Sequence, residues 1–211
     1  FSAEMERALQ VLDCAVLVIS AADGVQGHTE TLWKLLKRYE IPVFIFVNKM
    51  DQDGTDKKAV LGELRERFGE GCIDFTRILP EAEASPEELE NLAVCEEGMM
   101  EEYLETGSIR IDTLRKAAAE RKIFPCWFGS ALRAEGIEAL LDGIVQLAPE
   151  IHYPEEFGAK VYKIARDSQG TRLTYLKVTG GSLRVKDVLA DTGEKINQIR
   201  LYSGEKFETP Q

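Results

Sequence analysis

The sequence is poor in the residues that build metal sites and disulfide frameworks. Its 211 residues include two histidines, and its four cysteines, Cys14, Cys72, Cys95 and Cys126, are far apart and form no Cys-x-x-Cys pair. Closely spaced Cys and His ligands are typical of structural zinc sites, and dense cysteines are typical of secreted domains. The sequence therefore indicates reduced thiols, and we expect a cytoplasmic protein.

Long apolar runs are also missing. No stretch of about eighteen apolar residues is present, although a membrane-spanning helix needs one. The first ten residues carry neither a basic start nor an apolar core, so they do not have the pattern of a signal peptide. The sequence therefore predicts no membrane partner.

Basic residues are outnumbered by acidic ones. The chain has 26 Lys and Arg against 37 Asp and Glu, which gives a formal net charge of −11. A surface that binds nucleic acid needs an excess of positive charge to meet the phosphates, so we expect no direct DNA binding. Much of the acidity is local, because no Lys or Arg occurs between Arg77 and Arg110. We interpret this stretch as a solvated helical face, with a dedicated partner site as the alternative.

Strand and helix patterns alternate over the first 150 residues. Apolar, β-branched runs at 14–20 and 43–47 are typical of strands covered on both faces, and a third apolar run ends at Ala131. Strands alternating with helices in this way predict a parallel, doubly wound α/β sheet with helices on both faces. The helices are expected at about 3–12, 28–40, 55–68, 85–121 with a break near Gly107, and 135–147.

The pattern changes near residue 150. Pro149, Pro154 and Gly158, within or beside 151–157, predict a linker there. From 158 to 211, apolar and polar residues alternate between turn signals, which is typical of antiparallel strands. We expect the opening strands of a small barrel that the sequence does not close.

Three polar residues directly follow the apolar run 43–47. Ligands of doubly wound sheets bind beyond the carboxyl ends of the strands, where Asn48, Lys49 and Asp51 lie. Asp51 offers two acceptor oxygens side by side, which match the N1–H and exocyclic amine of guanine; adenine lacks this donor pair. Asn48 can donate to the far edge of the base and tie neighbouring loops, and the alkyl stem of Lys49 can cover the ring.

A second short motif, Gly129-Ser130-Ala131, follows the third apolar run. Its small residues allow backbone N–H groups to approach a ligand carbonyl closely. A turn that merely enters a helix is the alternative interpretation. The motif comes after "NKMD" in the chain, with one further strand and helix between them, and this position favours a second base-contacting loop. Ser130 and Ala131 are therefore added to the predicted guanine-binding residues.

These motifs resemble the G domain of the translational GTPases. "NKMD" looks like their guanine-specificity motif and "GSA" like their second base-contacting loop, while residues 1–25 are similar to the segment that follows their Asp-x-Pro-Gly-His motif. The resemblance implies an incomplete P-loop GTPase G domain at 1–150, with an acidic helical insertion at 80–121.

The resemblance continues beyond the G domain, because residues 159–189 look like the first part of the β-barrel second domain of the same proteins. It therefore implies a linker at 151–157 and the N-terminal part of an antiparallel translation-factor β-barrel at 158–211.

The motifs also favour one branch of this class. Gln52 follows the specificity motif, where elongation factor G typically has Arg, and "NKMDQDGTD" with "SAADGVQGHTETL" is more similar to the tetracycline-resistance ribosomal protection proteins. These imply a ribosome-dependent GTPase that dislodges tetracycline, with GTP or GDP as nucleotide and the ribosome as partner. Elongation factor G, a release-factor-type GTPase and a non-catalytic G-domain-like binding module remain alternatives.

Several family motifs do not occur in the sequence. There is no Gly-x-x-x-x-Gly-Lys-Ser/Thr phosphate loop and no switch segment, and the family's catalytic His falls upstream of the residue that matches Phe1. His28 and His152 match no catalytic position. We therefore expect a fragment of a longer protein, with the Mg²⁺ ligands elsewhere in it, that alone binds GTP feebly and does not hydrolyse it.

Overall fold

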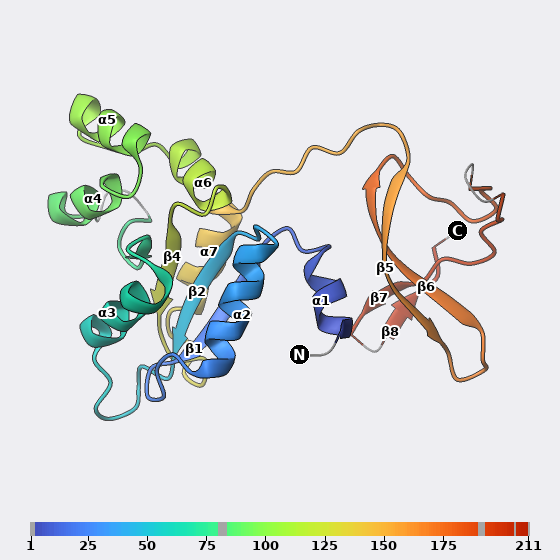
Figure 1. Ribbon diagram of the computed structural model, residues 1–211, viewed down its shortest axis with the longest axis horizontal. Coiled ribbons are helices and arrows are strands. Elements are labelled where there is room, and N and C mark those ends of the chain that lie inside the picture. The colour runs from blue at the N-terminus through green and yellow to red at the C-terminus, as the bar shows by residue number, and fades with distance from the viewer. Residues whose placement is uncertain (1–2, 80–83, 190–192, 205, 211) are drawn as a thin grey trace. The chain divides into compact units, whose positions relative to one another are not determined.

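The structure, a computed structural model, describes residues 3–79, 84–189, 193–204 and 206–210 (Figure 1). The chain divides into two compact units, Phe1–Ile151 and His152–Gln211. Each unit is described below by itself.

The first unit is built on a parallel sheet of four strands. Its order is β1 (Ala15–Ser20), β2 (Val43–Asn48), β4 (Phe124–Phe128) and β3 (Cys72–Asp74). All three neighbouring pairs are parallel. This arrangement confirms the predicted sheet, and it brings the carboxyl ends of β1, β2 and β4 to one edge, where doubly wound sheets bind ligands.

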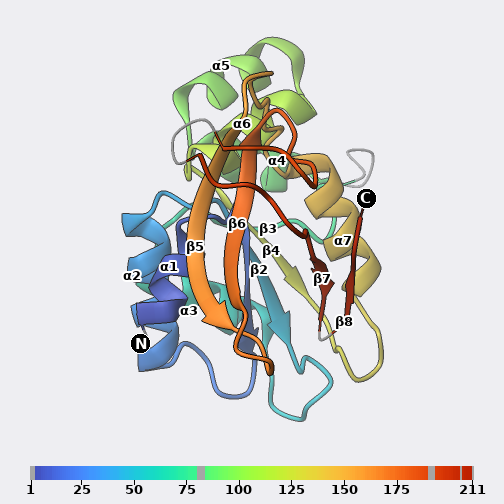
Figure 2. The same ribbon diagram turned by 90° about the vertical axis from the view of Figure 1, so that its right-hand side faces the viewer.

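Helices cover the sheet on both faces. Figure 2 shows α2 on one side of β2 and α7 on the other. None of the helices in the described residues has both the length and the apolar character needed to cross a membrane. The helices are α1 (Ala3–Leu9), α2 (Gly27–Arg38), α3 (Lys57–Phe68), α4 (Pro86–Ala93), α5 (Glu97–Thr106), α6 (Ile111–Ala119) and α7 (Ile137–Leu147).

The central strand β2 separates two hydrophobic cores. Successive side chains of a strand point to opposite faces, so Ile45 and Val47 enter the core beneath α2 and α3, while Phe44 and Phe46 enter the core beneath α4 to α7. Five of its six residues are buried, as the apolar run predicted. The tip of β2 is therefore held from both sides.

The edge strand β1 departs from the expectation. The apolar run 14–20 predicted coverage on both faces, but Val16 and Val18 remain 42% and 59% exposed. They alternate with the buried Leu17 and Ile19. The prediction was wrong because, within the described residues, only one face of β1 is well covered.

The acidic stretch forms three helices, α4 to α6, instead of one interrupted helix. The break near Gly107 is confirmed, because Gly107 ends α5 in the left-handed conformation, and a second break follows Ala93. Each helix buries an apolar side chain, Leu92, Met99 or Leu114. Most of their acidic residues are exposed, but the Glu102 side chain is only 12% exposed and pairs with Arg110. Residues 80–83 of the expected insertion lie outside the described residues.

The second unit contains antiparallel strands, as predicted. β5 (Gly158–Arg166) pairs with β6 (Arg172–Gly180), and β7 (Leu201–Ser203) pairs with β8 (Lys206–Glu208). Asp167 closes the β5–β6 turn by accepting hydrogen bonds from the backbone N–H groups of Gln169 and Thr171.

Candidate functional site

Two loops meet at the carboxyl edge of the sheet, one after β2 and one after β4. They are joined through their backbones, because Gly129 N–H donates to the Val47 carbonyl at 3.0 Å and Met50 N–H donates to the Gly129 carbonyl at 3.0 Å. Lys49 adopts the left-handed conformation with φ 65°, which turns the chain sharply at the end of β2. The two predicted motifs therefore lie side by side.

Asn48 ties these loops together through its side chain. Its Oδ1 accepts hydrogen bonds from the N–H groups of Lys49 and Ala131, each at 2.8 Å. One role predicted for this residue, the tie between loops, is thus present in the structure. Since the side-chain oxygen Oδ1 already accepts two hydrogen bonds within the protein, the side-chain amide nitrogen is the group of Asn48 that can face a ligand.

Ser130 is the buried residue of the second loop. Its backbone N–H donates to the Glu135 carbonyl, and Glu135 N–H donates back to the Ser130 carbonyl, both at 3.0 Å. Gly129 is required beside it, because a β-carbon there would lie 2.1 Å from the Glu135 carbonyl oxygen. The small residues thus allow the loop to fold onto itself, and the N–H groups of Ser130 and Ala131 both donate within the protein.

Asp51 points its carboxylate at the second loop. A hydrogen bond from the Ser130 hydroxyl lowers the pKa of this carboxyl, and the charge of Arg133 acts in the same direction. Arg133 Nε lies 3.6 Å from Asp51 Oδ2, and the Asp51 side chain is 14% exposed. The group is therefore ionised at neutral pH and acts only as an acceptor.

Lys49 reaches the third loop of this edge, the one after β1. Its Nζ lies 3.7 Å from Asp23 Oδ2. The nearby Ser20 hydroxyl and the charge of Lys49 lower the pKa of Asp23. The ammonium is thus drawn toward the β1–α2 loop, which leaves the alkyl stem of Lys49 lying between the loops.

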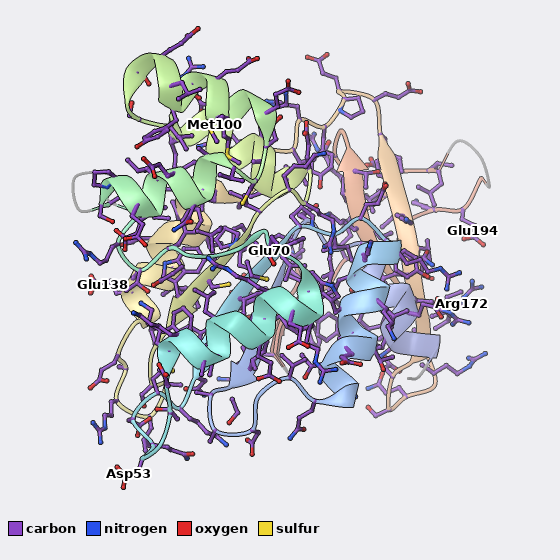
Figure 3. The ribbon with its side chains drawn as sticks, turned by 60° about the vertical axis from the view of Figure 1, so that its left-hand side comes forward. Asp53, Glu70, Met100, Glu138, Arg172 and Glu194 are labelled. Carbon is purple, nitrogen blue, oxygen red and sulfur yellow. The ribbon has the colours of Figure 1, made fainter. Side chains whose placement is uncertain are left out.

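A cavity of about 310 Å³ lies beside Asp23, between the β1–α2 loop and the start of α3. Its charged residues are Asp23, Asp56 and Glu63, and Glu63 accepts a hydrogen bond from Val25 N–H. This acidic lining would repel phosphate groups. Asp53 extends away from the sheet at the outer end of the β2–α3 loop (Figure 3).

Sequence reasoning missed Asp23 and Arg133. Each pairs with a residue of "NKMD" from a different loop, and that pairing depends on how the strands are ordered in the sheet. The only signal in the sequence is a charge of the right sign near the end of an apolar run, which is too common to select these residues. Among the described residues, no three His, Cys, Asp or Glu side chains group as a metal site would require.

A parallel sheet with helices on both faces, carrying polar loops at the carboxyl ends of adjacent strands, defines the doubly wound class of α/β proteins, whose ligands bind at those ends. Within this class, the family model described as the elongation factor Tu GTP binding domain matches residues 1–150, and the chain belongs to that family. The resemblance to translational GTPases inferred from the motifs is confirmed.

The chain is similar to two tetracycline resistance proteins. It is 34% identical over 209 residues to the oxytetracycline resistance protein of Streptomyces rimosus, covering 89% of this chain and 32% of that protein. It is also 34% identical over 220 residues to TetW of Butyrivibrio fibrisolvens, covering 96% and 34% respectively. The chain thus spans about a third of the length of these curated relatives.

A solved structure has the same fold. A crystal structure of a protein from Thermus thermophilus matches with a TM-score of 0.78 and 22% sequence identity, covering 99% of this chain and 38% of that one. At this identity, the likeness concerns the fold alone.

Proposed function

We propose that the loops after β2 and β4 bind the guanine base of GTP or GDP, and that Asp51 selects guanine. The observation that carries this proposal is the place of the Asp51 carboxylate, which lies 3.6 Å from Arg133 of the second loop at the ligand-binding edge of a GTP-binding-domain fold. Its two oxygens match the two adjacent donors of guanine. Adenine would leave the acceptor unpaired, and sites built on such hydrogen bonds reject the wrong partner by roughly 10⁴-fold.

The neighbouring residues have distinct roles in this proposal. The side-chain amide of Asn48 donates to the far edge of the base, and the stem of Lys49 covers one face of the ring. Ser130 orients Asp51. Ala131 N–H reaches the guanine carbonyl as a shared donor, because it also donates to Asn48 Oδ1.

For the whole protein, we propose a cytoplasmic, ribosome-dependent translational GTPase that releases tetracycline from the ribosome. Its support is the family membership together with the names of the two relatives. In this proposal residues 1–150 are the C-terminal part of the G domain with the insertion 80–121, 151–157 the linker, and 158–211 the start of the barrel. The Mg²⁺ ligands and phosphate contacts then belong to residues outside this chain.

The experiment uses the full-length protein that contains this chain and its Asp51→Asn variant. Wild type is expected to bind GTP and hydrolyse it when ribosomes are added. Asn at position 51 accepts one hydrogen bond and donates the other, which suits xanthine. We expect GTP binding to weaken roughly 10- to 100-fold, which is the cost of losing a charged acceptor, and ribosome-stimulated hydrolysis to move to xanthosine triphosphate.

Asp53→Asn is the matched control, because Asp53 is an exposed aspartate of the same loop (Figure 3). It should leave both activities unchanged. Unaltered nucleotide preference in Asp51→Asn would contradict the assignment of Asp51. Absence of ribosome-stimulated hydrolysis in wild type would favour a non-catalytic binding module, and translocation without tetracycline release would favour elongation factor G.

A further inference from the structure

Arg133 forms an ion pair with the Asp51 carboxylate. It follows Ser130 and Ala131 in a tight turn, where Arg133 N–H donates to the Ser130 carbonyl at 3.2 Å and to the Ser130 hydroxyl at 3.3 Å. Its backbone is thereby fixed to the residue that hydrogen-bonds Asp51. Its side chain is 58% exposed and places Nε 3.6 Å from Asp51 Oδ2.

This geometry leaves the carboxylate available for a ligand. At 3.6 Å the contact with Arg133 is an ion pair and not a hydrogen bond, so it occupies no lone pair of the carboxylate. Two carboxylate oxygens offer about four acceptor positions, of which Ser130 uses one. Guanine N1–H and the exocyclic amine can therefore bind while Arg133 stays in place.

An aspartate alone does not fix the plane of its carboxylate, because rotation about its terminal bond is broad. A second contact with the carboxylate, from Arg133 in the same loop as Ser130, restricts this rotation. A bidentate ligand gains from such restriction, because less conformational freedom is lost when it binds.

We propose that Arg133 is a positioning residue for guanine recognition, which holds the Asp51 carboxylate in the plane where both oxygens meet the base. The proposal rests on the proposed function of Asp51. It assigns guanine selectivity to three residues from two loops, namely Asp51, Ser130 and Arg133.

The test is calorimetric titration of GDP into the full-length protein and its variants, each checked for an unchanged melting temperature. Arg133→Gln is expected to weaken GDP binding about two- to five-fold, as for an exposed ion pair. Arg133→Lys should recover much of the affinity because it keeps the charge. The advantage of wild type over Arg133→Gln should shrink at high salt, which screens the pair.

A double-mutant cycle separates this role from a structural one. If Arg133 acts through the charge of Asp51, Arg133→Gln should have no effect on xanthosine diphosphate binding in the Asp51→Asn background. Arg67→Gln, which removes an exposed arginine paired with Glu30 at 2.8 Å, is the matched control and should leave GDP binding unchanged.

Two results would overturn the proposal. One is GDP binding by Arg133→Gln that equals or exceeds that of wild type, the latter meaning that Arg133 competes with the base. The other is an equal loss in both backgrounds. If Asp51→Asn itself keeps the guanine preference, the proposed function fails instead, so the two failures are distinguishable.

Discussion

Single residues of this site act on the protein as well as on a ligand. Asn48 holds two loops with one oxygen atom, and Ser130 holds Asp51 with its hydroxyl. Polar groups that are tied in this way keep their orientation before a ligand arrives, which reduces the conformational cost of binding. The structural and the binding contributions of Asn48 are therefore separable by mutation.

Asn48→Ala removes the acceptor for Lys49 N–H and Ala131 N–H. We expect the free energy of unfolding to fall by about 1 kcal/mol, the net worth of a typical hydrogen bond, and guanine nucleotide binding to weaken as well. Denaturant unfolding and calorimetry measure the two effects. Asn48→Asp is the control, because it keeps the acceptor oxygen but has no amide donor. Asn48→Asp should retain most of the stability and lose nucleotide binding. Equal stability of wild type, Asn48→Ala and Asn48→Asp would contradict the role of Asn48 in holding the two loops together.

The sequence predicted Asn48 and Asp51 because their chemistry and their place after a buried run are both local features. Asp23 and Arg133 could not be predicted in this way. Their contacts with Lys49 and Asp51 cross from one loop to another. Such contacts follow from the strand order β1-β2-β4, which a single sequence does not display.

At the scale of elements, the site rests on the packing of β4 against α7. Gly143 lies in the middle of α7, and a β-carbon there would be 2.1 Å from Trp127 Cζ2. Trp127 is fully buried on β4, two residues before Gly129. The close approach of helix and strand therefore depends on glycine at this position.

Gly143→Ala tests this packing. Alanine normally stabilises a helix relative to glycine, but here the added methyl group must displace Trp127, so we expect a loss of about 1–3 kcal/mol in unfolding free energy. Gly62→Ala in α3 is the control, since nothing lies within 4 Å of its added β-carbon, and it should stabilise by about 0.5–1 kcal/mol. Stabilisation by both substitutions in urea unfolding would contradict the account.

Helices and strands were predicted well where the apolar residues recur periodically. They were predicted less well where the burial of a strand face depends on whether a neighbouring helix covers it. The parallel strands and the helices α2, α3 and α7 follow from apolar runs and helical spacing. The exposed face of β1 was not predicted, because an apolar run shows that a strand can be buried and not whether a helix covers it. The second break, between α4 and α5, carries no glycine or proline at residues 94–96.

At the scale of the whole molecule, the charge is unevenly divided. Phe1–Ile151 contains 29 acidic and 16 basic residues, whereas His152–Gln211 contains 8 acidic and 10 basic residues. The excess of negative charge that disfavours nucleic-acid binding therefore lies in the first unit. The absence of direct DNA binding stays a prediction for the chain as a whole.

The most direct test of the central claim is a crystal structure of the full-length protein with GDP. The account predicts that guanine N1 and its exocyclic amine lie within about 3.2 Å of the two Asp51 carboxylate oxygens, between the loops after β2 and β4. A guanine ring bound elsewhere, or one that leaves Asp51 without a contact, would contradict it.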